Sequence, residues 1–113
     1  MMDKDWANEI PYAVTVCDIQ GKILYLNEKS KKTFFKDGGE NLIGTNLFGC
    51  HTPSSQSKIQ NLLDTHSSNI YTIQKNGQKK MIIQTPWFEN NEIQGLVEFS
   101  VELPADIPHF ERD

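Results

Sequence analysis

The chain has 113 residues, enough for one domain with a modest hydrophobic core. Its 11 basic and 15 acidic residues give a formal net charge of -4, which argues against a nucleic-acid-binding protein, because such proteins usually present a basic face. Apolar residues make up 37% of the chain and occur in groups, so we expect a folded domain rather than disorder.

The first residues lack the apolar segment of a signal peptide. No apolar run approaches the roughly 20 residues that span a bilayer. We therefore expect a cytoplasmic protein with no membrane partner and no nucleic-acid partner. The two cysteines are too few for a disulfide scaffold, and reduced thiols are the expectation for this compartment.

The first half of the chain predicts a β-hairpin followed by helices. Residues 13–18 are rich in β-branched side chains and residues 22–26 are mostly apolar, with a Gly-containing turn between these two strands. Asn27 is the expected N-cap of a short helix over 28–35. The best helix candidate spans about 53–66, where Ile59, Leu62 and Leu63 fall at helical spacing and His66 ends the stripe.

The second half predicts three antiparallel strands. Residues 70–75 and 80–85 flank Asn-Gly, the strongest two-residue hairpin signal in the chain. Pro86 implies an edge, a bulge or a strand end, because proline cannot donate to a ladder. The last strand alternates cleanly, and we expect its apolar residues on the buried face and its polar residues on the solvent face. The apolar set is Val97, Phe99, Val101 and Leu103, and the polar set is Glu98, Ser100 and Glu102.

This order predicts a single α+β domain over 1–113, with a core at about 8–103 and a tail at 104–113. Its five-stranded antiparallel sheet carries helices on one face. A pocket is expected between the sheet and the helices.

Cys50 and His51 are the chain's most conspicuous reactive pair. They directly precede a helix start in which Thr52 is a plausible N-cap and Pro53 fits the first helical position. Helix N–H groups there lower the pKa of a thiol or help to bind an anion. Three interpretations stay open: a redox-sensing thiol, a metal ligand, or a loop that only packs.

A metal site needs three or four ligands. The candidates are Cys50, His51 and His66, joined by Cys17 or His109 if folding brings them together. The chain lacks the nucleophile elbow, the phosphate loop and the paired-histidine motif of common enzymes. Adjacent side chains such as Cys50 and His51 usually diverge, so we expect no enzyme.

The ordered pattern resembles the PAS domain family across about 8–103. The likeness rests on Ile10 to Val14, on Asp18-Ile19-Gln20-Gly21-Lys22-Ile23, on Tyr25-Leu26-Asn27, on Ile43-Gly44, and on Gly95 to Ser100. Cys50-His51-Thr52-Pro53 also looks like the Cys-His-Pro-Pro type motif of a bacterial PAS subgroup that is often attached to hemerythrin-like domains. Thr52 stands where that motif has its first proline.

The resemblance implies a sensory domain that binds a small molecule or a partner protein in signal transduction. PAS domains hold haem, flavin or metabolites between sheet and helices, and often form homodimers. Flavin photochemistry is not expected, because Leu47 occupies the place of the photoreactive cysteine. The ligand-pocket candidates are Cys50, His51, Tyr25, Trp87 and Phe99.

Two alternatives remain from the sequence. One is a haem or metal redox or gas sensor that uses Cys50, His51 or His66, none of which sits in a clear haem motif. The other is a ligand-free module that only dimerises or pairs with partner proteins. We expect a homodimer to use the segment around Trp6 and Ile10, because the solvent face predicted for the last strand is polar.

Overall fold

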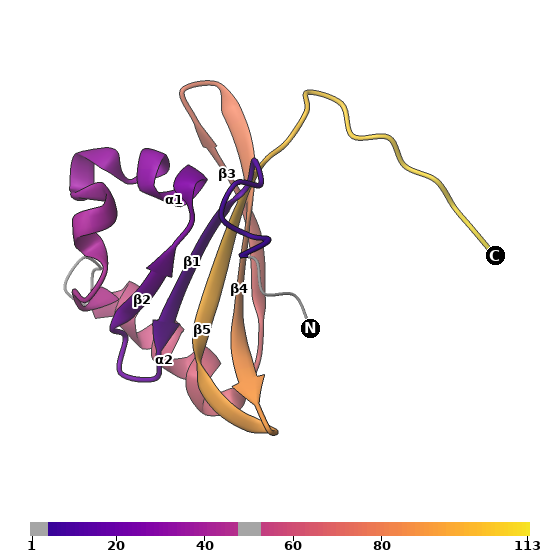
Figure 1. Ribbon diagram of the computed structural model, residues 1–113. Helices are drawn as coiled ribbons and strands as arrows, with labels where there is room; N and C mark the ends of the chain where they lie inside the picture. The colour runs from indigo at the N-terminus through magenta and orange to yellow at the C-terminus, as the bar shows by residue number, and fades with distance from the viewer. Residues whose placement is uncertain (1–4, 48–52) are drawn as a thin grey trace.

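A five-stranded antiparallel sheet in the order β2-β1-β5-β4-β3 carries the helices on one face (Figure 1). The computed structural model describes residues 5–47 and 53–113. The predicted α+β architecture is confirmed. The elements are β1 (Ala13–Asp18), β2 (Ile23–Leu26), α1 (Glu28–Thr33), the 3-10 turns η1 (Phe35–Asp37) and η2 (Gly39–Leu42), α2 (Pro53–Thr65), β3 (Asn69–Lys75), β4 (Gln78–Glu89) and β5 (Glu92–Glu102).

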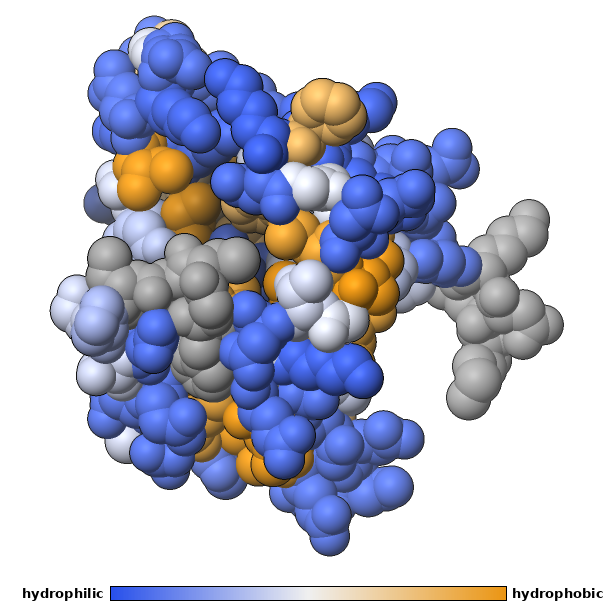
Figure 2. Space-filling model, turned by 90° about the vertical axis from the view of Figure 1, so that its left-hand side faces the viewer, coloured by the Kyte–Doolittle hydropathy of each residue, from blue (hydrophilic) through white to orange (hydrophobic). Residues whose placement is uncertain are grey.

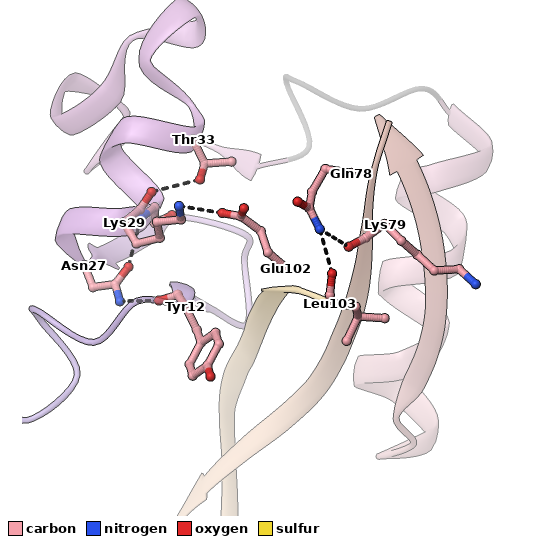
Figure 3. A network of polar contacts seen from close by, with 9 residues as sticks. Tyr12, Asn27, Lys29, Thr33, Gln78, Lys79, Glu102 and Leu103 are labelled. Carbon is pink, nitrogen blue, oxygen red and sulfur yellow. Dashed lines mark hydrogen bonds and ion pairs between the residues drawn. The ribbon is translucent and has the colours of Figure 1, made fainter. Parts of the chain in front are cut away.

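Asn27 joins the first hairpin to the first helix. Its side chain is 0% exposed. Its Oδ1 accepts hydrogen bonds from the backbone N–H groups of Ser30 and Val14, both at 2.9 Å. Its Nδ2 donates to the carbonyl of Ala7 at 2.8 Å. The same nitrogen donates to the carbonyl of Tyr12 at 2.7 Å (Figure 3). The predicted helix cap is confirmed, and the same side chain also fastens the N-terminal segment to the domain.

A β-bulge interrupts the pairing of β1 with β2. Val16 lies opposite Tyr25 and Cys17 lies opposite Ile23, so Leu24 is the extra residue. Side chains alternate along a strand, but a bulge shifts the alternation by one residue. Tyr25 therefore shares the side of Val16, and Ile23 shares the side of Cys17.

Helix α2 ends as the sequence predicts, at His66. The helix stops at Thr65, and His66 takes the left-handed conformation with φ +56°. The N–H of Ser67 donates to the carbonyl of Leu62 at 3.1 Å, the 6→1 bond of a Schellman motif. The His66 ring meets Phe88 edge-on, with 5.4 Å between ring centroids. Its place is that of a helix-terminating residue.

The hydrophobic core lies where α2 packs on the middle of the sheet. The predicted helical stripe of Ile59, Leu62 and Leu63 is buried there against Cys17 of β1 and Leu96 of β5. β1 and β5 approach closely at Gly95, where a Cβ would lie 1.9 Å from the carbonyl oxygen of Cys17. Only glycine fits at that point. In the described part of the chain, no helix is both long and apolar enough to cross a membrane.

The expected facing of the last strand is wrong. Glu98 and Ser100 line a cavity together with residues of α2, and Ser100 is only 9% exposed. Alternation then places Val97, Phe99 and Val101 on the side of the sheet turned away from the helices. Polar side chains of the sheet face the helices because a cavity, rather than packed apolar side chains, lies between the two layers over much of their area.

β4 is longer than expected and runs through Pro86. β3 pairs with β4 only as far as Gln84, so β4 has a single neighbour, β5, at Pro86. A bulge follows between Trp87 and Phe88. Pro86 is thus tolerated at a local edge, one of the situations that the sequence predicts. Beyond β5 the tail runs away from the sheet in Figure 1 and leaves Phe110 exposed.

We predict that Asn27→Ala lowers the free energy of unfolding by about 3 kcal/mol, since it removes a helix cap and leaves buried carbonyl and N–H groups without partners. Urea unfolding followed by circular dichroism measures the change. Asn61→Ala, on the exposed side of α2, is the matched control and should change stability by less than about 0.5 kcal/mol. An Asn27→Ala variant as stable as this control would contradict the assigned role.

Candidate functional site

Two adjoining cavities lie between the sheet and the helices. The larger has a volume of about 430 Å³ and the smaller about 250 Å³. Both are lined by residues of α2, of β4, of β5 and of the α1–η1 segment. The residues that they share are Phe34, Asp37, Ile59, Gln84 and Glu98. Since the cavities share these walls, they adjoin one another, and together we call them the hollow beneath the helices.

A polar row crosses the sheet at the junction of the two cavities. Asn69 of β3 lies opposite Gln84 of β4, Gln84 opposite Glu98 of β5, and Glu98 opposite Thr15 of β1. Asn69 Nδ2 donates to Gln84 Oε1 at 3.2 Å, and Gln84 Nε2 donates to Glu98 Oε2 at 2.9 Å. The Thr15 and Ser30 hydroxyls lie 2.6 Å apart and connect the row to α1.

Gln84 is 6% exposed. Amide groups buried to this extent are normally hydrogen-bonded. Both ends of its amide group have partners within the polar row. The Glu98 carboxylate accepts one of these bonds, and a carboxylate has about four acceptor sites. The row is therefore held in place and still has capacity to accept hydrogen bonds from a molecule in the cavity.

Tyr71 and Lys58 form one wall of the larger cavity. Burial, with a further contribution from the charge of Glu98, raises the pKa of the Tyr71 hydroxyl. This hydroxyl therefore stays protonated and can donate a hydrogen bond at neutral pH. Lys58 Nζ lies 5.8 Å from the centre of the Tyr71 ring, within the range of a cation–π contact.

The two ends of the hollow differ in polarity. The smaller cavity is lined mainly by apolar side chains, whereas Lys75 and Lys80 line the opposite end of the larger cavity, which we call the lysine end. Figure 2 views the helix side and shows hydrophobic side chains between hydrophilic ones. The apolar residues that line the smaller cavity are Ile23, Leu26, Leu42, Leu47, Leu96, Phe34 and Ile59.

An ion pair ties α1 to β5 beside the lysine end. Lys29 Nζ lies 2.5 Å from Glu102 Oε1 (Figure 3), and Glu102 lies opposite Lys80 in the sheet. The hydrogen bond and charge of Lys29 lower the pKa of the Glu102 carboxyl. The charge of Lys80 contributes as well, so Glu102 compensates positive charge from both Lys29 and Lys80.

The sequence-predicted pocket residues have varied positions. Cys50 and His51 lie outside the described residues. Tyr25, Trp87 and Phe99 are not among the residues that line either cavity. Phe99 lies on the sheet side opposite to the helices, and Trp87 Nε1 donates to the Cys17 carbonyl at 3.1 Å.

The Tyr25 hydroxyl lies outside the hollow, where it donates to Asp5 Oδ2 at 2.7 Å. Burial, the hydrogen bond to Asp5 and nearby negative charge raise the pKa of Tyr25 to about 12. Tyr25 therefore holds the N-terminal segment in place.

The metal candidates are not brought together within the described chain. His66 lines neither cavity. In residues 5–47 and 53–113, no three His, Cys, Asp or Glu side chains are grouped so that they could hold a metal ion. Cys17 lines the apolar cavity, and burial raises the pKa of its thiol. Cys17 thus stays a neutral, weakly nucleophilic thiol.

Sequence reasoning missed the polar row. Gln84 stands among apolar residues of a strand, and Glu98 belongs to the alternating polar set assigned to solvent. The sequence feature that indicates the polar row is the isolated amide of Gln84 inside an otherwise apolar strand. Tyr71 also lines the larger cavity, and which side of its strand faces the helices cannot be read from sequence alone.

Comparison with known proteins identifies the fold. No protein-family model matches the chain, and neither does any curated protein. The PAS domain of the histidine kinase ThkA aligns with TM-score 0.65 at 16% identity, over 80% of this chain and 97% of that one. The Vibrio cholerae Aer2 receptor, described as a dual PAS-heme oxygen sensor, aligns with TM-score 0.63 at 18% identity, over 82% and 95%.

The Vibrio cholerae VqmA dimer, a LuxR-type receptor, aligns with TM-score 0.65 at 18% identity. The alignment covers 86% of this chain and 48% of VqmA, so the chain spans about half of that protein. VqmA has also been solved bound to DPO. At these identities the likeness shows a shared fold, and the chain has the PAS fold.

We predict that Cys17 reacts slowly with a thiol reagent in the folded protein. A Cys50→Ser variant leaves Cys17 as the only cysteine. Its native reaction with dithionitrobenzoate should be at least about 100-fold slower than in urea, because the buried thiol reacts only after opening. A native rate within about threefold of the unfolded rate would contradict the burial of Cys17.

Proposed function

We propose that the chain is a sensory signalling domain that binds a small molecule in the hollow between sheet and helices. The observation that carries this proposal is the polar row at the bottom of a cavity of about 430 Å³, a volume in the range of small-molecule sites. Structural neighbours that act as receptors or belong to a histidine kinase support the same use of the fold.

A ligand in this position contacts several elements at once. Gln84 and Glu98 come from β4 and β5, Phe34 follows α1, and Lys58 comes from α2. Binding therefore stabilises one arrangement of helices over strands. The difference between the ligand's affinities for the two arrangements sets how far binding shifts the population toward the favoured one. A partner protein reads the shift.

Among the described residues, which do not include Cys50 and His51, the geometry gives less support to the alternative of a haem or metal sensor. His66 ends α2 and packs against Phe88 rather than lining the hollow. The walls of the hollow offer hydrogen-bonding groups and apolar side chains. A small organic molecule fits such a lining better than a ligated metal centre.

The side of the sheet away from the helices favours a second role, as a homodimer interface. We call this side the open face. Its central row runs from Ile70 through Ile83 to Phe99, all apolar. VqmA, a neighbour of the same fold, is a dimer. We propose that a second copy of this chain covers the open face, which replaces the expectation based on a polar outer face of β5.

To test ligand binding, we predict that protein purified from its source cells carries a bound small molecule. Native mass spectrometry should show an added mass that denaturation releases. Gln84→Leu should abolish this added mass, because the leucine keeps the volume and removes the amide. Gln60→Leu, on the exposed side of α2, is the control and should retain it.

The same spectra separate the alternatives. An identical apo mass for the wild type and both variants would contradict the proposal and favour a pure interaction module. A coloured preparation with iron or zinc by elemental analysis would favour the haem or metal sensor instead.

To test the homodimer, we predict that the wild type elutes at twice its 12.9 kDa mass in light-scattering chromatography. Ile70→Lys should give a monomer at the same concentration, since it places a charge in the apolar interface. Ile70 is 61% exposed, so the change leaves the fold intact. Ile19→Lys, in the first hairpin turn, is the control. A wild-type monomer at about 100 µM would contradict the interface.

A further inference from the structure

The hollow changes in chemistry along the strands. At one end, beside Leu96, it is apolar. In the middle, the polar row offers amide and carboxylate groups. At the other end, Lys75 and Lys80 line it. Lys80 precedes Gln84 by four positions on β4, which corresponds to about 13 Å along a strand.

The lysine end holds positive charge that Glu102, opposite Lys80, compensates only in part. In residues 5–47 and 53–113, the paired lysines are Lys29 and Lys31, whose partners are Glu102 and Glu28. Lys58, Lys75 and Lys80 form no ion pair there and all line the larger cavity. Lysine heads are strongly hydrated point charges, and an anion held between Lys75 and Lys80 gains from both.

Two acidic residues also line the larger cavity. Their positions determine where along the cavity each polar group of a ligand binds favourably. Glu98 lies in the polar row, about 13 Å from the lysine end, and Asp37 lies in η1. An anionic group therefore finds its favourable place at the lysine end and an unfavourable one beside Glu98. A hydrogen-bond donor finds its favourable place beside Glu98.

The geometry points to an amphipathic carboxylic acid as the ligand class. This inference rests on the proposed sensory function and specifies the ligand of the same site. Its apolar body fills the smaller cavity among Leu26, Leu47 and Leu96. A hydroxyl or amide N–H in mid-molecule donates to Glu98. Its carboxylate lies between Lys75 and Lys80.

Calorimetric titration of the full chain tests this with 12-hydroxyoctadecanoate, whose hydroxyl lies in mid-chain, used below its micellar concentration. Its uncharged methyl ester and octadecanoate, which lacks the hydroxyl, are the companion probes. We expect the hydroxy acid to bind at least about tenfold more tightly than either companion, because each of them loses one matched group.

Lys75→Gln/Lys80→Gln should weaken binding of the hydroxy acid at least about tenfold and leave binding of the ester unchanged. The matched control is Lys22→Gln/Lys79→Gln, which removes the same charge from exposed lysines outside both cavities. It should bind like the wild type. This pair separates a local effect of the lysine end from an effect of net charge.

The ligand class is overturned if the ester binds as tightly as the acid. It is also overturned if the two double variants behave alike, or if the molecule recovered from source cells is neutral or cationic. In each of these cases, the proposed sensory function is still supported if a ligand binds in the cavity and Gln84→Leu abolishes its binding. If no probe binds and no molecule is recovered, the ligand class and the proposed ligand-binding function both fail.

Discussion

The position of β5 between β1 and β4 determines both faces of this domain. Backbone pairing on both sides fixes the register of β5, so Glu98 faces the helices and Phe99 faces away. A shift of one residue would exchange these faces completely. The hydrogen bond from Gln84 to Glu98 and the approach of β1 at Gly95 both depend on this register. The cavity and the open face are therefore two consequences of one strand alignment.

The order of elements and several local features were predictable from sequence. Asn27 has the chemistry of a helix cap, and the spacing of Ile59, Leu62 and Leu63 indicates one buried helix face; both occur in the structure. Such features depend on residues close together in the chain. They are therefore readable without knowledge of tertiary packing.

The facing of β5 was not predictable in the same way. Alternation shows that a strand has two different faces, but not which of them meets the helices. The alternation favours burial of the apolar face, which is the common arrangement in an antiparallel sheet covered on one side. Here the helices cover a partly polar hollow, and Phe99 lies on the other side. The polar row needs Asn69, Gln84 and Glu98 side by side, and their pairing appears only once three strands are aligned.

The ligand site follows from this arrangement. A polar row inside a sheet is costly unless its members bond to each other, and Gln84 bonds to both Asn69 and Glu98. The remaining hydrogen-bonding capacity of Glu98 and the positive charge of Lys75 and Lys80 face the same hollow. Because the hollow touches α1, α2 and the central strands, its occupancy couples directly to how the two layers sit together.

A crystal structure of the protein purified from its source cells tests the central claim most directly. The account predicts electron density for a small molecule between sheet and helices, in contact with Gln84 and Glu98, with Phe99 on the opposite face of the sheet. An interior filled by protein side chains, or a molecule bound away from the polar row, would contradict it.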